Sequence, residues 1–479
     1  MRVIKYGLLV MIGLLSGCFL IGPDYQKPDV TVPEQWRFAA HDAQNTANLA
    51  WWQQFNDPVL NRLIAQGLEN NLDLRIAIAH IEQFVGVYGA TRSSLFPQLS
   101  GQGAYDRRQV SGNSTGLDES MPDSDLAQLG INLLWELDVW GQLRRAKQAA
   151  YADVLAQEAV RDGVILTLVS AIAQTYIDLR TLDHNLEITH DMVKTLTEEN
   201  RIAKIRFDIG YGSEIEVSQS DSELERRRAL IPHYEELIAQ TEHALCLLLG
   251  QPPAAIDRGL TLNELPLLAV PAGLPSDLLR RRPDIQRAEQ NLIAATAQIG
   301  VAKGEYFPKI RLTGDLGQAS LEVASLFTPG ANFWTVGARF LGPLFTAGRI
   351  AGQVQTAEAA QQAALAGYQK AILDGLREFE DALVSRHKAD RRHVIQQQRV
   401  QALQHYVRLS HLRFDEGYTS YLEVLDALRQ YYEGQIDRVQ ARNQTLISVV
   451  TLYRAMGGGW LADLLNRDED SAKSAAVWP

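Results

Sequence analysis

The stretch RFDIGY at residues 206–211 decides the fold, because it returns as RFDEGY at residues 413–418, an offset of 413 − 206 = 207. The same offset pairs Gly250 with Gly457. This period is far longer than the roughly 20 to 50 residues of solenoid repeats. The sequence therefore predicts two copies of one large structural unit.

The overall composition is that of an ordinary globular protein. The chain has 479 residues, 46% of them hydrophobic, and a formal net charge of −11. This hydrophobic content excludes wholesale disorder, and the acidic balance argues against a nucleic-acid-binding surface. Two cysteines leave no disulfide framework and no thiolate metal cluster. Beyond the first 21 positions no run of about 20 apolar residues predicts a transmembrane helix.

The first residues are typical of a bacterial lipoprotein signal. Two basic residues precede an apolar stretch over residues 6–15, which is too short to span a membrane. LSGC at residues 15–18 resembles a lipobox, in which the cysteine becomes the first mature residue and carries the acyl chains. We expect a signal peptide over residues 1–17 and an acyl and diacylglycerol modification of Cys18, with no other cofactor. Phe19, where an Asp would retain the protein in the inner membrane, indicates export to the outer membrane; a plain signal peptide with an incidental cysteine is the alternative.

Each copy has the same order of predicted elements. A helical pattern over residues 57–95, and again over 276–306, is ended by a proline. Alternating apolar and polar residues then predict β-hairpins over residues 98–138 and 308–341. Period-two segments of about ten residues, rich in glycine and aromatic residues, suit a membrane β-barrel strand. A soluble hairpin with one hydrated face fits the pattern alone equally well.

A very long helical pattern follows each hairpin, over residues 141–206 and 348–413. At about 1.5 Å per residue each helix would be roughly 100 Å long. Its narrow apolar stripe predicts coiled-coil packing on other helices. A glycine-containing turn then reverses the chain into a return helix, so each copy contains a helical hairpin with unequal arms.

The chain is thus expected to contain six segments in series. They are a signal peptide (1–17), a lipidated N-terminal segment (18–56), a first repeat (57–250), a proline-rich connector (251–275), a second repeat (276–458) and a C-terminal tail (459–479).

Four strands cannot close a barrel, and each unpaired edge amide is costly in lipid. If the strands lie in a membrane, several chains must share one barrel. Eight strands leave no pore, whereas twelve or more can enclose one.

Five motifs in a fixed order carry a family resemblance. They are GPDYQKP at 22–28, LLLGQPP at 247–253, RRRPDI at 280–285 with AE at 288–289, FP at 307–308, and LFTAGR at 344–349. The chain resembles the outer-membrane efflux lipoproteins, the TolC/OprM-like (NodT) group. The resemblance implies a mainly α fold with membrane β structure: a homotrimer whose 12-stranded β-barrel continues into a long periplasmic α-helical barrel. The connector and chain ends would join an equatorial region.

The same resemblance implies the function and its partners. The chain would be the outer-membrane channel of a tripartite efflux pump, a passive exit duct for drugs or other small molecules. It would act with a periplasmic adaptor, the membrane fusion protein, and an inner-membrane pump of the resistance-nodulation-division (RND) type. Metal-ion export or type I protein secretion by the same architecture is the alternative.

The resemblance also places a gate at the periplasmic turns of the helical hairpins. Relatives close there and carry acidic residues near the constriction; the matching residues here are Asp426, Glu423 and, in the first hairpin, Glu216. Glu423 and Asp426 are three residues apart and share a helix face. Rings of negative charge would favour cations in a pore. Alternatively, these acids are ordinary solvated surface residues.

The closed state of relatives uses polar and ionic links between neighbouring hairpins. Four charged residues are candidates for such a latch: Arg206, Asp208, Arg413 and Asp415. Phe414 stands where some relatives have a tyrosine, and it has no hydroxyl to donate. We expect an Arg413–Asp208 link.

Two other classes of protein compete with the channel. No phosphate-binding loop, Gly-x-Ser-x-Gly or His-Glu-x-x-His motif is present, so the sequence predicts no enzyme, no catalytic residue and no metal site. A purely structural coiled-coil lipoprotein of the periplasm would explain the helices but not the paired alternating segments.

Overall fold

The computed structural model describes residues 20–29, 50–109, 123–268 and 281–458. The elements in chain order are η1 (Trp51–Phe55), α2 (Pro58–Asn70), α3 (Leu72–Ser93), β1 (Gln98–Arg108), β2 (Ser124–Leu137), α5 (Gln142–Asp208), α6 (Glu214–Arg228), α7 (Leu230–Leu248), α9 (Pro283–Gly304), β3 (Lys309–Ser320), η2 (Val323–Ser325), η3 (Pro329–Ala331), β4 (Asn332–Leu341), α10 (Arg349–Asp415) and α11 (Tyr421–Ala455). Cys18, the signal peptide and the C-terminal tail lie outside the described residues.

The chain divides into two compact units, and each draws on both copies of the repeat. The strand unit comprises Met1–Asp29, His80–Glu158 and Arg287–Gln369. The hairpin unit comprises Val30–Ala79, Ala159–Gln286 and Lys370–Pro479. The duplicated halves of the sequence are therefore interleaved in space.

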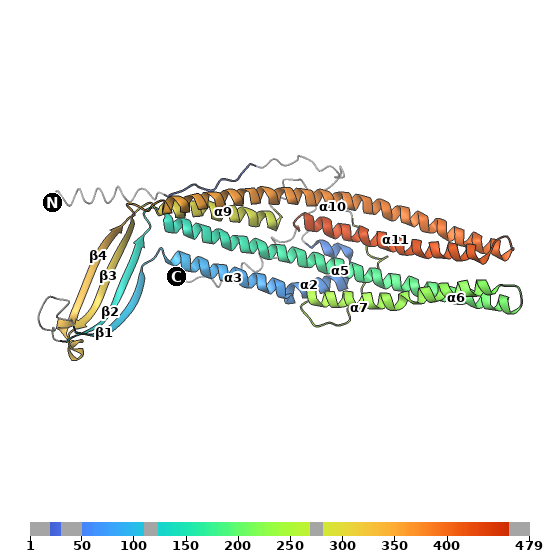
Figure 1. Cartoon of the computed structure of the whole chain (residues 1–479), viewed down its shortest axis with the longest axis horizontal. Coiled ribbons are helices and arrows are strands. Elements are labelled where there is room, and N and C mark those ends of the chain that lie inside the picture. The colour runs from blue at the N-terminus through green and yellow to red at the C-terminus, as the bar shows by residue number, and fades with distance from the viewer. Residues whose placement is uncertain (1–19, 30–49, 110–122, 269–280, 459–479) are drawn as a thin grey trace. The chain divides into compact units, whose positions relative to one another are not determined.

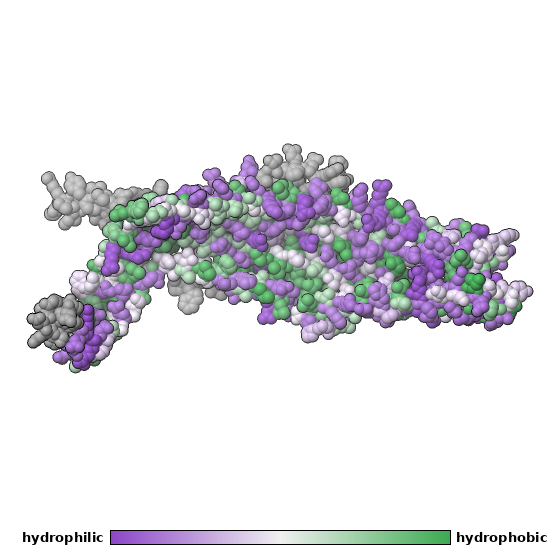
Figure 2. All heavy atoms as spheres, viewed as in Figure 1, coloured by the Kyte–Doolittle hydropathy of each residue, from purple (hydrophilic) through white to green (hydrophobic). Residues whose placement is uncertain are grey.

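The four strands of the strand unit form one antiparallel sheet in the order β1-β2-β3-β4 (Figure 1). The central β2–β3 pairing joins the two copies of the repeat, and there the Asn132 amide donates to the Asp315 carboxylate at 2.6 Å. In the described chain β1 and β4 each pair on one side only. Figure 2 shows apolar side chains on the sheet surface, and on β4 Trp334 and Val336 are 75% and 78% exposed.

The first helical pattern, expected as one helix from residue 57 to 95, is broken in two at Asn71. The Asn71 backbone is extended, with φ −61° and ψ 131°. Its side-chain oxygen accepts from the backbone N–H of Leu74 at 3.0 Å, as an N-cap does, and its amide donates to the carbonyl of Leu248 at 2.9 Å. The single helix expected here is thus wrong, because one polar side chain caps a new helix.

The return helix of the first copy is also interrupted, whereas that of the second copy is not. Ala229 separates α6 from α7, although its N–H still donates to the Glu225 carbonyl at 3.1 Å, while α11 runs unbroken from Tyr421 to Ala455. Pro232 lies three residues beyond the break, and its ring nitrogen cannot donate to the carbonyl of Arg228. The two copies therefore differ where only one carries a proline.

The main hydrophobic core belongs to the hairpin unit. Trp51 is fully buried and stacks on Tyr453 with ring centroids 5.2 Å apart. The buried Asp57 carboxylate accepts from the Tyr176 hydroxyl at 2.8 Å and from the backbone N–H of Leu260 at 3.0 Å, so it ties the proline-rich connector to α5. One window of α5 has the hydropathy of a membrane span, but 56% of that window is buried inside the protein, as in a core helix.

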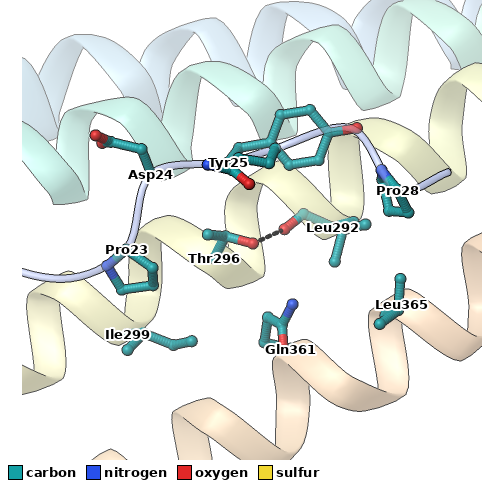
Figure 3. Close-up of a pocket in the computed structure, with 10 residues that line it drawn as sticks. Pro23, Asp24, Tyr25, Pro28, Leu292, Thr296, Ile299, Gln361 and Leu365 are labelled. Atoms are coloured by element: carbon teal, nitrogen blue, oxygen red, sulfur yellow. Dashed lines mark hydrogen bonds between the residues drawn. The ribbon is translucent and has the colours of Figure 1, made fainter.

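Residues 20–29, the N-terminal strap, cross α9 in the strand unit (Figure 3). Buried Arg145 holds the strap by donating to the Ile21 carbonyl at 3.1 Å and to the Asp24 carboxylate at 2.7 Å. Farther along, Tyr25 donates to the Glu289 carboxylate at 3.0 Å. The GPDYQKP and AE motifs therefore contact each other. A groove of about 660 Å³ lies beside the strap, lined also by α9 and α10.

Candidate functional site

The repeated RFDxGY motif builds a helix-ending turn in both copies. In the first, the Tyr211 N–H donates to the Arg206 carbonyl at 2.8 Å and the Gly210 N–H donates to the Phe207 carbonyl at 2.9 Å. This pair of bonds is a Schellman motif, which requires a left-handed residue after the helix. Gly210 and Gly417 supply it, with φ values of 79° and 77°. The turns end α5 and α10 at the same end of the hairpin unit (Figure 1).

Glu216 belongs to the cap of α6. The Ser213 hydroxyl accepts from the Glu216 N–H at 3.3 Å, and the Glu216 carboxylate accepts from the Ser213 N–H at 3.4 Å. This reciprocal capping box satisfies two backbone donors that the helix start leaves free. Glu216 therefore has a local structural role, whatever charge it also presents to a pore.

Glu423 occupies the third position of α11, equivalent to Glu216 in the first copy. Its carboxylate accepts from the Arg413 guanidinium at 3.0 Å and from the Thr419 hydroxyl. Asp426, one turn later, is exposed and accepts from the Gln430 amide at 2.7 Å. Of the three predicted acids, Asp426 is the one without a bond to a guanidinium or to a helix cap.

Within the described chain Arg413 pairs with Glu423 of the same hairpin. The Arg413–Asp208 link, expected between neighbouring hairpins of the closed channel, stays a prediction. Arg206 instead lies with its guanidinium carbon 4.5 Å from the centre of the Phe414 ring, a cation–π contact between the two hairpins. Phe414 thus helps to join the first helical hairpin to the second, at what we call the junction between the hairpins, through its ring, although it has no hydroxyl.

Asp208 and Asp415 end the two long helices and are both exposed. Asp415 acts electrostatically on Glu199, which lies on α5. Carboxylates at a helix C-terminus face the negative end of the helix dipole, which disfavours them locally. The dipoles of α5 and α10 therefore do not stabilise these two carboxylates.

A buried ion cluster that joins the hairpins includes residues that sequence reasoning missed. Glu223 of α6 is 2% exposed and accepts from Arg226 at 2.9 Å, from Arg227 at 2.8 Å and, across the junction, from Arg429 of α11 at 2.7 Å. Burial alone raises the pKa of Glu223, but the three guanidinium groups outweigh it and hold the pKa below its ordinary value. A glutamate followed at three and four residues by arginines was the available signal.

Apolar side chains complete the junction between the hairpins. Tyr421 of α11 is buried, lies with its ring centre 5.4 Å from that of Phe414, and reaches the Ser220 hydroxyl at 3.5 Å. Met192 and Leu196 of α5 pack into the same cluster. The turns thus form one packed assembly held by an apolar cluster, a buried ion cluster and a cation–π contact.

Comparisons with known proteins agree with this architecture. The family described as Outer membrane efflux protein matches residues 63–251 and 274–458. The toluene efflux pump outer membrane protein TtgC and the antibiotic efflux pump outer membrane protein ArpC, both from Pseudomonas putida, are each 35% identical over 455 residues, covering 93% of this chain and 94% of the relative. The solved structure of the outer-membrane channel OprN has a TM-score of 0.85 and 29% identity, covering 92% of this chain and 99% of OprN.

These likenesses confirm the expected fold class, mainly helical with a membrane β part, and the outer membrane as its location. They identify the function as that of an outer-membrane efflux channel working as a component of a pump, and nothing in them points to an enzyme. The chain belongs to the outer membrane efflux protein family.

Proposed function

We propose that three copies of this chain form one passive duct through the outer membrane, with no catalytic step. The observation that carries the proposal is the four-stranded sheet, in which β1 and β4 each pair on one side only within the described residues. Because the strands alternate in direction and are even in number, β4 of one copy can pair antiparallel with β1 of the next. Two copies would give eight strands and a filled interior, whereas three give twelve and leave room for a channel.

The surface chemistry of the sheet supports its place in lipid. Leu99 on β1 is largely exposed, as are Trp334, Val336 and Phe340 on β4. In water such a patch would be costly, whereas a membrane strand presents alternate apolar side chains to lipid. Closing the ring of strands also gives each backbone amide at the sheet edges a hydrogen-bond partner, which lipid cannot supply.

The lipid anchor at Cys18 is a separate part of the proposal. An acyl and diacylglycerol group there would insert beside the barrel, while Arg145 holds the strap that begins two residues later. Lipid chains on one residue give only an anchor, so the barrel supplies the stable attachment to the membrane.

The hairpin turns form the periplasmic gate in this proposal. The packed junction around Phe414 and Tyr421 lets the two turns of one chain move together. Three copies each of Asp426, Glu423 and Glu216 would add negative charge near the opening and favour cations. Arg206, Asp208, Arg413 and Asp415 remain the candidates for contacts that hold the turns closed.

The proposed partners are a periplasmic adaptor and an inner-membrane pump of the RND type. Both relatives named above are components of efflux pumps, for toluene in one case and antibiotics in the other. We propose small organic molecules of these kinds as cargo. A duct without a binding site for cargo leaves selection to the pump.

The oligomer is tested by migration in gels. Outer-membrane fractions should contain a species of three chains in unheated detergent samples that becomes a single chain on boiling. A monomeric periplasmic species poor in β structure would contradict the proposal.

Cargo is tested by returning the gene to a strain that lacks it. Restored tolerance to toluene and antibiotics supports the proposed cargo, while restored export of metal ions or of a protein alone would favour those alternatives.

A further inference from the structure

A histidine–glutamate contact bridges the two long helices close to the turns. The Nε2 atom of His411 on α10 lies 3.8 Å from the Oε1 atom of Glu199 on α5. The side chains are 32% and 20% exposed, so water reaches the imidazole while the carboxylate is mostly covered. The contact joins the first repeat to the second within the hairpin unit.

Charged groups of both signs lie around this pair. Glu198 on α5 and Asp415 on α10 both act on Glu199, and Glu198 is itself paired with Arg201 at 2.5 Å. Burial raises the pKa of Glu199, His411 opposes this, and Asp415 and Glu198 add to it. When the imidazole is neutral, the Glu199 carboxylate is therefore left partly buried beside the Asp415 charge, while Arg201 offsets the Glu198 charge.

The other packed helices contribute tyrosines that stay protonated near neutral pH. On α11, burial raises the pKa of Tyr421 to about 12 and also raises the pKa of Tyr432. From α6, the Glu216 charge acts on Tyr421 and the Arg227 charge acts on Tyr432. Arg227 is itself bound to Glu223, so it does not neutralise Glu199.

Two other described links between the hairpins do not change charge near neutral pH. The pKa of Glu223 is held low by its three arginines, so that cluster stays ionised. The Arg206–Phe414 contact involves a guanidinium, which keeps its proton in proteins. Imidazole is the side chain that titrates between about pH 5 and 8.

We propose that His411 and Glu199 form a pH-sensitive contact that draws the two hairpins together in mildly acidic conditions and loosens them as the pH rises. The inference rests on the proposed function, since it regulates the turns assigned there as the gate. Protonated imidazole attracts the carboxylate and offsets the repulsion from Asp415. Loss of that proton removes the attraction while the repulsion stays, so hydration of Glu199 favours separation of α5 from α10. At still lower pH, protonation of Glu199 ends the attraction.

The distance between the two helices tests the contact directly. Spin labels at I202C and L409C, both exposed positions, would report it by pulsed electron resonance in the full-length protein in lipid nanodiscs. Cys246 is fully buried and should not be labelled. We expect the short-distance population to rise about fivefold from about pH 8.5 to about pH 6, as for a partly exposed ion pair. His411→Gln and Glu199→Gln should abolish this response.

His405→Gln is the matched control, because His405 lies exposed on the same helix beside Arg408 and away from Glu199. It should keep the full pH response. A pH response that survives in His411→Gln overturns the proposal. The absence of a pH response in the chain that keeps both Glu199 and His411 overturns it as well. His411 is partly exposed, so its variant should fold even if the Glu199 variant does not. Failure to conduct ions in a lipid bilayer would instead count against the channel function, whatever the spin labels show.

Discussion

Equivalent residues in the two copies have taken different roles. Arg206 and Arg413 begin the same motif, yet the first lies over the Phe414 ring and the second pairs with Glu423. Both arginines satisfy the same backbone turn through their carbonyls, which any residue could do. The motif thus preserves the turn, while the side chains are free to specialise at the junction between the hairpins.

Asp426 is the acid most available to a pore, because it is exposed and bound to no guanidinium. Asp426→Ala should weaken block of the channel by trivalent metal cations at least severalfold in bilayer recordings, since it would remove three charges from one ring. Asp437→Ala is the control, because that exposed acid on the same helix pairs with Arg399. Unchanged block in Asp426→Ala would remove this residue from the constriction.

Folding stability should depend on pH through His393. It is buried on α10 with an unpartnered Nδ1, and burial together with Arg442 and Arg438 lowers its pKa, against a weaker effect of Asp390. The pKa of His393 is lower in the folded chain than the unfolded value of about 6.5. Its contribution to stability is therefore complete above that value and is lost as the pH falls from there through the lowered folded pKa.

We therefore expect the urea concentration at the midpoint of unfolding, followed by the helical signal, to decrease when the pH is lowered from about 7.5 to about 5.5. His393→Leu should reduce that decrease. His387→Gln, at an exposed position of the same helix, should leave it unchanged. An equal fall in His393→Leu and the parent chain would show that the pKa of His393 is the same in the folded and unfolded states.

At the scale of elements, the hairpins are joined by a buried ion cluster rather than by surface pairs. Glu223 links α6 to α11 through Arg429 and neutralises Arg227, which is 8% exposed. Removing one member of such a cluster leaves a buried charge without a partner. Surface pairs such as Glu225–Arg228 contribute little, because water screens them.

Glu223→Ala should accordingly destabilise the hairpin unit by about 3 kcal/mol, whereas Glu225→Ala should cost under about 0.5 kcal/mol. Chemical denaturation followed by circular dichroism measures both. Similar values for the two variants would mean that the arginines around Glu223 find water or other partners when it is absent.

At the scale of the whole molecule, the composition averages over two environments. Among the described residues most side chains belong to helices, and four strands carry exposed apolar side chains such as Trp334 and Val336. A membrane strand is apolar at alternate positions only, so a hydropathy total cannot reveal it. Within the described residues β1 and β4 each lack a second partner strand, and in the proposed channel neighbouring copies would pair these edges.

Sequence alone determined the features that depend on local repetition. The 207-residue duplication, the period-two strands and the long helices follow from spacing along the chain. The turn in RFDxGY follows from a glycine at the one position that needs a positive φ. Each of these requires only residues that are close in sequence, and so each could be predicted.

Only the tertiary structure decided which side chains meet. Asn71 interrupts the first helix while reaching Leu248, 177 residues away, and Glu223 binds Arg429, 206 residues away. Arg413 binds Glu423, because α11 folds back beside the end of α10 and brings that carboxylate within hydrogen-bond distance. Partners of this kind depend on how helices pack, and packing depends on the whole apolar surface rather than on any short stretch of residues.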